Sequence, residues 1–235
     1  MSEQKRLQVD NRLIERLTQK ERKALLSDCE TVELSFGQIL CEPRTPLRFA
    51  YFPLTGFISL VTTLGDHLPM EVGLIGNEGM LGVTLMLGVD EAPLRAIVQG
   101  NGSALKISAS RLRRRLLEST KLQKTLNRYL YVLMDELSTS AACNQFHELQ
   151  PRMARWLLMT HDRAHSDHFY LTHAYLAGML GVRRSGITVA AGALQRDMII
   201  SYSRGEISIL DRKGLEETCC ECYETTIDDY GRLLP

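Results

Sequence analysis

The chain has 235 residues, of which 44% are hydrophobic and 24% charged, and its formal net charge at pH 7 is zero. This composition suits a folded protein with a substantial core and excludes a disordered chain. No apolar run approaches the roughly 18–20 residues of a membrane span, and the first ten residues lack the apolar core of a signal peptide. We therefore expect a cytoplasmic protein with no membrane partner.

Glycine and proline are concentrated in the first half of the chain. Ten of the 17 glycines lie between Gly37 and Gly102, and five of the seven prolines between Pro43 and Pro93. Turn signals at this density predict short strands, so we expect a β domain over residues 32–107, built as a sandwich or a jelly-roll-like barrel. One short amphipathic helix is expected before it, with Leu13, Leu17, Leu25 and Leu26 on its apolar side.

A long helix is expected after the β domain, because apolar residues recur there at steps of three or four. The stripe consists of Leu122, Leu126, Leu130, Leu133 and Leu137, with Tyr129 and Val132 widening it. Such a helix has two uses: it lies on the β domain, or its stripe pairs with a second copy across a two-fold axis. We favour the second use and predict a homodimer through these leucines.

A helix-turn-helix pattern follows. Pro151 is suited to open a helix, and a further short helix is predicted to begin after Thr172 as its N-cap and to end at Gly181. Ala177 provides a small residue where two helices cross, Gly181 provides positive φ at the turn, and Ile187 anchors the second helix. The second helix, about residues 184–194, is expected to bury Ile187, Ala190 or Ala191, and Leu194. Two packed helices also show this spacing by chance, so the pattern alone is weak evidence.

The segment after these helices strengthens the interpretation. Two alternating runs, residues 199–202 and 206–210, are joined through Ser203, Arg204 and Gly205, which predicts a β-hairpin. A hairpin in this position is a wing, and Arg204 at its tip is placed to meet a phosphate. Residues 150–213 carry a local charge of +4 and residues 214–235 a charge of −5. A basic module favours a polyanionic partner, although a solvated basic face explains the charge equally well.

These features together resemble the Crp/Fnr family of bacterial transcription regulators, most strongly from Leu171 to Asp211. The resemblance implies an α+β protein with three parts: a cyclic-nucleotide-binding-like sensor β-roll with flanking helices (1–118), a dimerisation helix (119–149), and a winged helix-turn-helix with an acidic tail (150–235). It implies binding to double-stranded DNA at a palindromic operator, with RNA polymerase as a further candidate partner. The expected DNA contacts are Thr172, Arg183, Arg184, Ser185, Thr188, Val189 and Arg204.

The sequence departs from cyclic-AMP-binding members of that family at the effector site. Those members resemble one another in a Gly-Glu-x-Gly segment followed by an Arg-Ser or Arg-Thr pair. Here the aligned residues are Gly79 to Gly82, with Met80 in place of the glutamate, and then Leu94 and Arg95. A thioether does not accept a ribose hydroxyl bond as a carboxylate does. We expect an effector other than cyclic AMP, or none, with Gly79, Met80, Gly82 and Arg95 as the candidate residues.

The recognition helix departs as well. Many relatives resemble R-E-T-V-S-R at this point, whereas this chain has R-S-G-I-T-V from Arg184 to Val189. The acid that accepts from cytosine is replaced by Ser185, so we expect a different operator, with Thr188 or Val189 against a thymine methyl, or a looser preference. Gly186 and Gly192 are expected to weaken this helix by about 0.5–1 kcal/mol each relative to alanine.

Two clusters of metal-binding residue types remain. His161, His165 and His168 would align on a continuous helix, but the segment reads as a helix end followed by a turn. Cys219, Cys220 and Cys222 lack the spacing of a zinc knuckle, and we interpret them as free thiols of an acidic tail. All six cysteines are irregularly spaced, which favours free thiols in a reducing compartment. Cys29 and Cys41 are too few for an iron–sulfur cluster.

The sequence thus predicts a homodimeric, sequence-specific DNA-binding transcription regulator without catalytic activity, cofactor or metal. No G-x-S-x-G segment or phosphate-binding Walker loop is present. Two-fold symmetry would place paired recognition helices roughly 34–36 Å apart. The alternatives are a cyclic-nucleotide-responsive activator of the same fold and, from another class, a metal-binding or redox-sensing protein that uses the histidines or the carboxy-terminal cysteines. The effector and the direction of regulation are left open.

Overall fold

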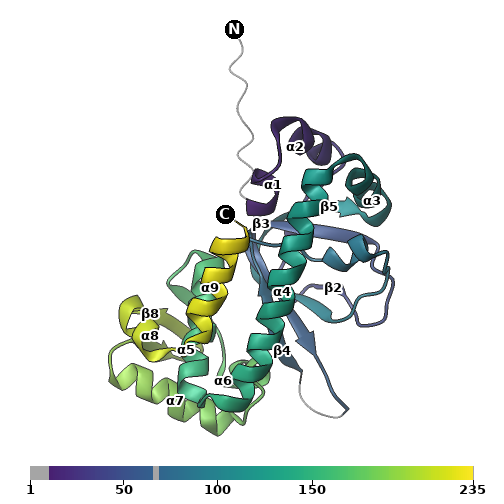
Figure 1. Cartoon of the computed structure of the whole chain (residues 1–235). Coiled ribbons are helices and arrows are strands. Elements are labelled where there is room, and N and C mark those ends of the chain that lie inside the picture. Colours follow the sequence, from purple (N-terminus) through teal and green to yellow (C-terminus); the bar gives the residue numbers. More distant parts are fainter. Residues whose placement is uncertain (1–10, 66–68, 235) are drawn as a thin grey trace.

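Five antiparallel strands form the amino-terminal half of the protein. The computed structural model describes residues 11–65 and 69–234. The strands are β1 (Glu30–Leu34), β2 (Ile39–Cys41), β3 (Phe49–Thr62), β4 (Met70–Ile75) and β5 (Arg95–Ser108). They follow the order β1-β5-β3-β4, with β2 also paired to β5 (Figure 1). The strands span Glu30 to Ser108, close to the expected 32–107, and confirm a β domain.

The two longest strands bend the sheet into a roll. The register between β3 and β5 shifts between Pro53 and Ile58, and such bulges bend a strand and increase its twist. Gly56 has φ +70°, and a Cβ there would lie 2.4 Å from the Gly100 carbonyl oxygen. This close approach of two backbones excludes a side chain at the bend. The roll is closed by the 3₁₀ helix η1 (Val83–Leu87) between β4 and β5.

The amino-terminal helical segment differs from the prediction of one helix. It contains two helices, α1 (Arg12–Glu15) and α2 (Gln19–Leu26). Thr18 caps α2, and its side chain and that of Glu21 form a reciprocal capping box, which starts a new helix at this point. The expected apolar residues still face the core, since Leu13 and Leu25 are each 1% exposed.

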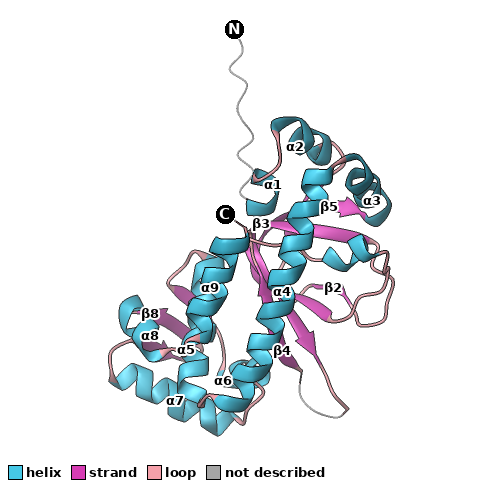
Figure 2. Ribbon diagram, in the orientation of Figure 1, coloured by secondary structure: helices cyan, strands magenta, loops and turns pink. Residues whose placement is uncertain are grey.

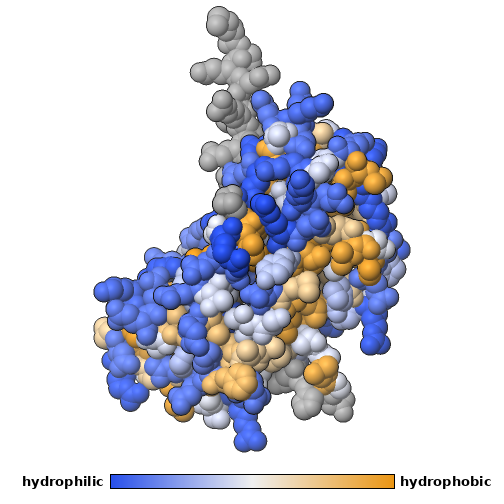
Figure 3. Space-filling view, viewed as in Figure 1, coloured by the Kyte–Doolittle hydropathy of each residue, from blue (hydrophilic) through white to orange (hydrophobic). Residues whose placement is uncertain are grey.

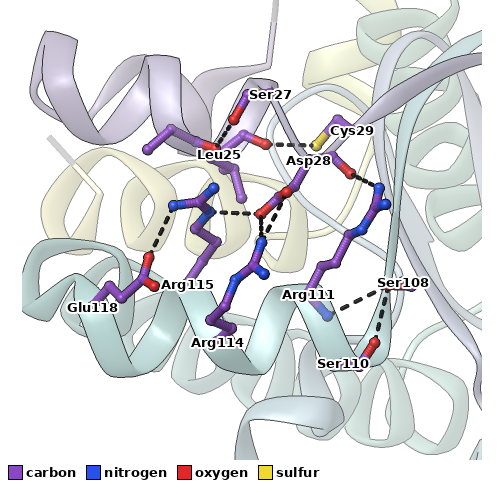
Figure 4. A network of polar contacts seen from close by, with 11 residues as sticks. Leu25, Ser27, Asp28, Cys29, Ser108, Ser110, Arg111, Arg114, Arg115 and Glu118 are labelled. Atoms are coloured by element: carbon purple, nitrogen blue, oxygen red, sulfur yellow. Dashed lines mark hydrogen bonds and ion pairs between the residues drawn. The ribbon is translucent and has the colours of Figure 1, made fainter.

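An aspartate joins the end of α2 to α3 (Ala109–Glu118). Figure 4 shows Arg114 and Arg115 donating to the Asp28 carboxylate, at 2.8 and 2.7 Å, while Arg111 donates to the Asp28 carbonyl. The hydrogen bonds from Arg114, followed by those from Arg115, outweigh desolvation and lower the pKa of Asp28. These contacts orient α3, which leads directly into the long helix.

The long helix α4 (Thr120–Phe146) packs on the β-roll of its own chain. Ser119 caps it by accepting from the Leu122 backbone N–H at 3.0 Å. Leu122, Leu126 and Leu133 are 2%, 0% and 8% exposed within the roll's core. Leu130 and Leu137 pack beside them. The leucine stripe that was predicted to pair with a second copy thus packs against the roll of its own chain, with Leu130 and Leu137 partly exposed.

The carboxy-terminal half is helical around a small sheet (Figure 2). Its elements are α5 (Leu149–Ala164), β6 (His168–Tyr170), α6 (His173–Leu180), α7 (Arg184–Arg196), β7 (Ile200–Ser203), β8 (Glu206–Ile209), α8 (Arg212–Thr218) and α9 (Cys222–Leu233). The strand order is β6-β8-β7. The predicted hairpin is confirmed. Strand β6 was not predicted, because a strand of three residues is too short to show an alternating pattern in the sequence. A second hydrophobic core lies under these helices.

The acidic tail is also structured, contrary to its interpretation as a simple tail. It forms α8 and α9, and α9 returns to lie along α4 (Figure 1). Tyr230, Leu233 and Leu234 pack against the core of the β-roll, and the Arg16 side chain donates to the Leu234 carbonyl. The carboxy-terminal helix therefore ties the two halves together. No helix among residues 11–65 and 69–234 has the length and hydropathy required to cross a bilayer.

Candidate nucleic-acid interface

Helices α6 and α7 form the predicted helix-turn-helix. Thr172 caps α6, with its hydroxyl accepting from the Tyr175 backbone N–H at 3.2 Å. Gly181 ends α6 with φ +65°, and the Val182 N–H then bonds back to the Ala177 carbonyl at 2.9 Å. Each of these features could be predicted from the sequence because capping and positive φ are local properties.

The turn itself rests on the β-roll. A Cβ on Gly181 would lie 2.7 Å from the Met70 sulfur at the start of β4, and the φ of +65° at this position favours glycine. The Met179 sulfur lies 3.6 Å from the Gln99 side-chain nitrogen of β5. Helix α6 thus packs on the roll. Helix α7 follows it, and the side of α7 that does not pack against the protein is exposed to solvent.

The second helix, α7, separates a buried side from an exposed one. Ile187 and Leu194 are fully buried, and both Ala190 and Ala191 are buried with them. The five candidate DNA contacts at its amino-terminal end lie on the other side: Arg183, Arg184, Ser185, Thr188 and Val189. Val189 is 74% exposed, high for a β-branched apolar residue. The prediction of a buried side and a solvent side for this helix is confirmed.

The two glycines of α7 have different surroundings. A Cβ on Gly186 would lie 2.9 Å from the Leu149 side chain, whereas nothing lies within 4 Å of a Cβ on Gly192. Gly186 therefore allows the recognition helix to approach the start of α5. Gly192 weakens the helix without a packing reason of this kind.

A histidine connects the recognition helix to the hairpin, a role that was not predicted from the sequence. His173 stacks on Tyr202 of β7 with ring centroids 4.5 Å apart and planes 8° apart. Its Nδ1 lies 3.0 Å from the Thr188 hydroxyl. Burial, followed by the charge of Arg184, lowers the pKa of His173. The position directly after the Thr172 cap was its only local signal, because both partners lie at least 15 residues away in the chain.

The hairpin of β7 and β8 presents the predicted tip. Arg204 and Gly205 have φ of +53° and +92°, and Arg204 is exposed. The Leu171 N–H donates to the Gly205 carbonyl at 2.6 Å, and the Tyr202 hydroxyl donates to the Leu171 carbonyl at 3.0 Å. These bonds fix the hairpin beside the start of α6, where Thr172 is also exposed.

The candidate effector residues each make contacts within the protein. Met80 is fully buried, and its carbonyl accepts from the Tyr129 hydroxyl at 3.2 Å. A Cβ on Gly79 would lie 2.4 Å from that hydroxyl, so Tyr129 fills the space above it. Arg95 is paired with Glu42 at 2.7 Å. Gly82 has φ +92° and lies against Ala50. A cavity of about 360 Å³ lies elsewhere, between α1, α5 and α9.

The three histidines and the three carboxy-terminal cysteines that are close together in the sequence do not share one environment in the structure. Helix α5 ends before His165, as expected, and the three histidines have different surroundings: His161 contacts Asp167 at 2.7 Å and His168 contacts Ser208 at 2.8 Å. Cys219 donates to the Glu216 carbonyl, whereas Cys220 and Cys222 are buried beside Cys143. All six cysteines are free thiols.

Comparisons with known proteins agree with this architecture. The family model for the Crp-like helix-turn-helix domain matches residues 151–218. A protein from Eubacterium rectale assigned to the Crp/Fnr family has TM-score 0.69 and 17% identity over 88% of this chain and 96% of that chain. A Crp/Fnr-family regulator from Thermus thermophilus has TM-score 0.67 and 24% identity over 83% of this chain and 98% of that chain.

A c-di-GMP-responsive global regulator from Xanthomonas campestris has TM-score 0.66 and 15% identity over 82% of this chain and 99% of that chain. No curated protein matches the chain. Identities this low show a shared fold, and the family model adds a sequence match over the helix-turn-helix and its hairpin. Residues 151–218 therefore match the Crp-like helix-turn-helix domain, and the chain as a whole shares its fold with solved structures assigned to the Crp/Fnr family.

Proposed function

We propose that the protein is a dimeric transcription regulator that binds duplex DNA sequence-specifically through α7. The observation that carries the proposal is the exposed amino-terminal end of α7 on a helix-turn-helix scaffold. In such motifs the second helix lies in the major groove with its first residues against base edges. Arg184 is the first residue of α7, and its guanidinium suits guanine O6 and N7.

The other residues of this face have distinct roles in this proposal. Arg183 and Arg204 bind phosphates on either side of the groove, and Thr172 adds a contact from the start of α6. Thr188 is held by His173, so its methyl group, together with the Val189 side chain, is the part that meets a thymine methyl. Ser185 supplies the remaining polar contact to a base.

Arg184→Ala is expected to relax the preference at one base pair of each half-site, at a cost of about 1–3 kcal/mol for the correct base. The measurement is selection of binding sites from a random duplex library at fixed salt, with wild-type and variant protein. Arg196→Ala is the matched control, because Arg196 is an exposed arginine at the opposite end of the same helix. Identical base preferences for wild type and Arg184→Ala would contradict the assignment of Arg184.

The proposed dimer uses a second stripe of α4, distinct from the leucine stripe predicted from the sequence. Exposed residues recur along this helix at steps of four and three: Asn127, Tyr131, Met134, Ser138, Ala141 and Gln145. This 3.5-residue spacing is typical of paired helices, and the small residues allow close approach. Tyr131 and Met134 are 56% and 61% exposed. Figure 3 shows a mixture of hydrophilic and hydrophobic side chains along this visible face of α4.

Sedimentation velocity checks the dimer. Wild-type protein is expected to sediment at twice the 26.6 kDa mass of the chain, and the double variant Tyr131→Lys, Met134→Lys is expected to shift to the monomer, because it buries two charges at the seam. Val189→Lys is the control, since Val189 is a comparably exposed apolar residue on α7. A dimer that survives the double variant would place the interface elsewhere.

Cyclic AMP is not the ligand in this proposal. Met80 is buried in the core and Tyr129 fills the space above Gly79, so the residues that would meet a ribose are used for packing. The proposal includes a small-molecule effector only if it binds outside these residues. RNA polymerase is the expected protein partner of a regulator that activates from its operator.

A further inference from the structure

Four side chains with metal-binding atoms converge where α4 meets the carboxy-terminal helices. Cys143 lies in the last turn of α4, and His147 follows its end. Cys220 and Cys222 flank the junction of α8 and α9, more than 70 residues further along the chain. One ligand atom from each of the four lies within 4.8 Å of all the others. The three cysteines are buried and the histidine is half-buried.

The distances between these atoms suit a single tetrahedral ion. Zinc–sulfur bonds of about 2.3 Å separate neighbouring ligand atoms of a tetrahedron by about 3.8 Å. The Cys143 and Cys220 sulfurs are 3.6 Å apart, and the Cys222 sulfur is 3.6 Å from His147 Nδ1. A disulfide would require about 2.05 Å between the sulfurs. Two of the donor–donor distances are thus those of neighbouring ligands around one centre, and all four donors lie within 4.8 Å of one another.

The histidine is oriented as a ligand. Its Nδ1 faces the Cys222 sulfur, while its Nε2 lies 3.1 Å from the Glu221 carboxylate. A carboxylate on the far nitrogen holds the proton there and leaves the lone pair of the other nitrogen for a metal, an arrangement common around metal-binding histidines. Glu221 lies between Cys220 and Cys222, so one short turn provides two thiols and this orienting group.

Cationic side chains lie next to the cluster. Arg155 of α5 donates to the Ser140 hydroxyl at 3.2 Å, about one turn before Cys143. Arg152 donates to the Asn144 side chain at 2.6 Å. Three thiolates around a divalent ion leave one net negative charge, and cationic groups on the neighbouring turns of α4 and α5 favour such a charge.

We propose that Cys143, His147, Cys220 and Cys222 bind one Zn²⁺ in a structural site. Thiolate and imidazole donors favour zinc over calcium or magnesium, and four protein ligands leave no open coordination position for catalysis. An iron–sulfur cluster is usually held by four cysteines. The site fastens the α8–α9 junction to the end of α4, and so fixes the carboxy-terminal domain against the long helix.

Elemental analysis of the full-length, untagged protein, purified under reducing conditions, tests the site. Wild type is expected to contain one zinc per chain, and Cys222→Ser and His147→Asn are expected to lose most of it. Cys219→Ser is the matched control, because Cys219 is adjacent in sequence but bonds to Glu216 and lies outside the cluster. Protein that remains metal-free after incubation with equimolar zinc, or equal zinc in Cys219→Ser and Cys222→Ser, would overturn the proposal.

Two further measurements protect against a variant that fails to fold. Cobalt(II) in place of zinc is expected to give the visible absorption of a tetrahedral thiolate site, which Cys222→Ser abolishes while its circular dichroism is retained. A strong chelator is expected to lower the unfolding temperature of wild type and not of Cys222→Ser. Four free thiols instead of six in denatured, non-reduced protein would indicate a disulfide and refute the site. None of these readouts involves DNA, so they stand apart from the proposed function.

Discussion

Replacing Arg163 by Met is expected to lower the free energy of unfolding by about 3–5 kcal/mol, because two buried carboxylates then lose their cation. The Arg163, Glu78 and Glu136 side chains are 8%, 10% and 1% exposed. Methionine has a similar length and no charge, so the variant removes the ion pairs while it keeps much of the packing. Urea unfolding followed by circular dichroism measures the loss.

The network joins three separate parts of the fold. Arg163 of α5 donates through Nε to Glu78 at 2.8 Å and through Nη1 to the Met159 carbonyl at 3.1 Å. Its Nη2 lies 3.8 Å from the Glu136 carboxylate on α4. Desolvation raises the pKa of Glu136, and the charge of Arg163 opposes this rise. Arg163 therefore stabilises the negative charges of two buried carboxylates at the junction of the β-roll, the long helix and α5.

A triple variant separates electrostatics from packing. Arg163→Met combined with Glu78→Gln and Glu136→Gln removes every charge of the network, and it is expected to recover most of the lost stability. Arg163→Met should also lose less stability at pH 5 than at pH 8, because Glu136 takes up a proton more readily at the lower pH. A single variant within about 1 kcal/mol of wild type at both pH values would show that the network does not stabilise the fold.

Sequence alone predicted the features of this fold that depend on neighbouring residues. Thr172 caps α6, Gly181 takes positive φ and Gly205 turns the hairpin, and each of these is determined within a few residues of the chain. The 3.6-residue period correctly assigned Ile187 and Leu194 to the buried side of α7. Local signals were therefore sufficient to find the helix-turn-helix and its exposed face.

What the sequence could not specify was the partner of each buried surface. The leucine stripe of α4 indicated that one side is buried, but a period is the same whether the cover is a second copy or the chain's own β-roll. The cysteine pattern gave no sign of the four-residue cluster for a related reason. Cys220 and Cys222 have the wrong spacing for a zinc knuckle, and their neighbours in the fold, Cys143 and His147, lie more than 70 residues earlier. Contacts over such separations are determined by the fold.

The second large effect concerns Glu71 of β4, whose side chain contacts α5. Its carboxylate accepts from Trp156 Nε1 at 2.7 Å and from the Ser59 hydroxyl. Desolvation raises the pKa of Glu71 to about 7, despite these hydrogen bonds and the charge of Arg163. An ordinary glutamate in the unfolded chain has a pKa of about 4.3. The folded state therefore holds a proton that the unfolded state releases at lower pH.

Glu71→Gln is consequently expected to stabilise the protein substantially more at pH 8 than at pH 5. Below the unfolded pKa, Glu71 is protonated in both the folded and the unfolded state, so it does not lower the stability of the wild type. As the pH rises, the unfolded state ionises first, so the free energy of unfolding of the wild type decreases. This loss of stability grows until the pH reaches the folded pKa of about 7, where it approaches about 3 kcal/mol. Glutamine retains both contacts, because its oxygen accepts from Trp156 and its amide donates to Ser59.

Urea unfolding at pH 5 and pH 8 measures this difference, with Glu33→Gln as the control. Glu33 is an exposed residue of β1, so its substitution should change stability little, and equally, at both pH values. A stability difference for Glu71→Gln that is the same at pH 5 and pH 8 would mean that Glu71 ionises normally in the folded protein. A difference that grows with pH would show that the contact between the β-roll and α5 is made with a protonated carboxyl, and that the folded state loses stability as the pH rises from about 4 to about 7.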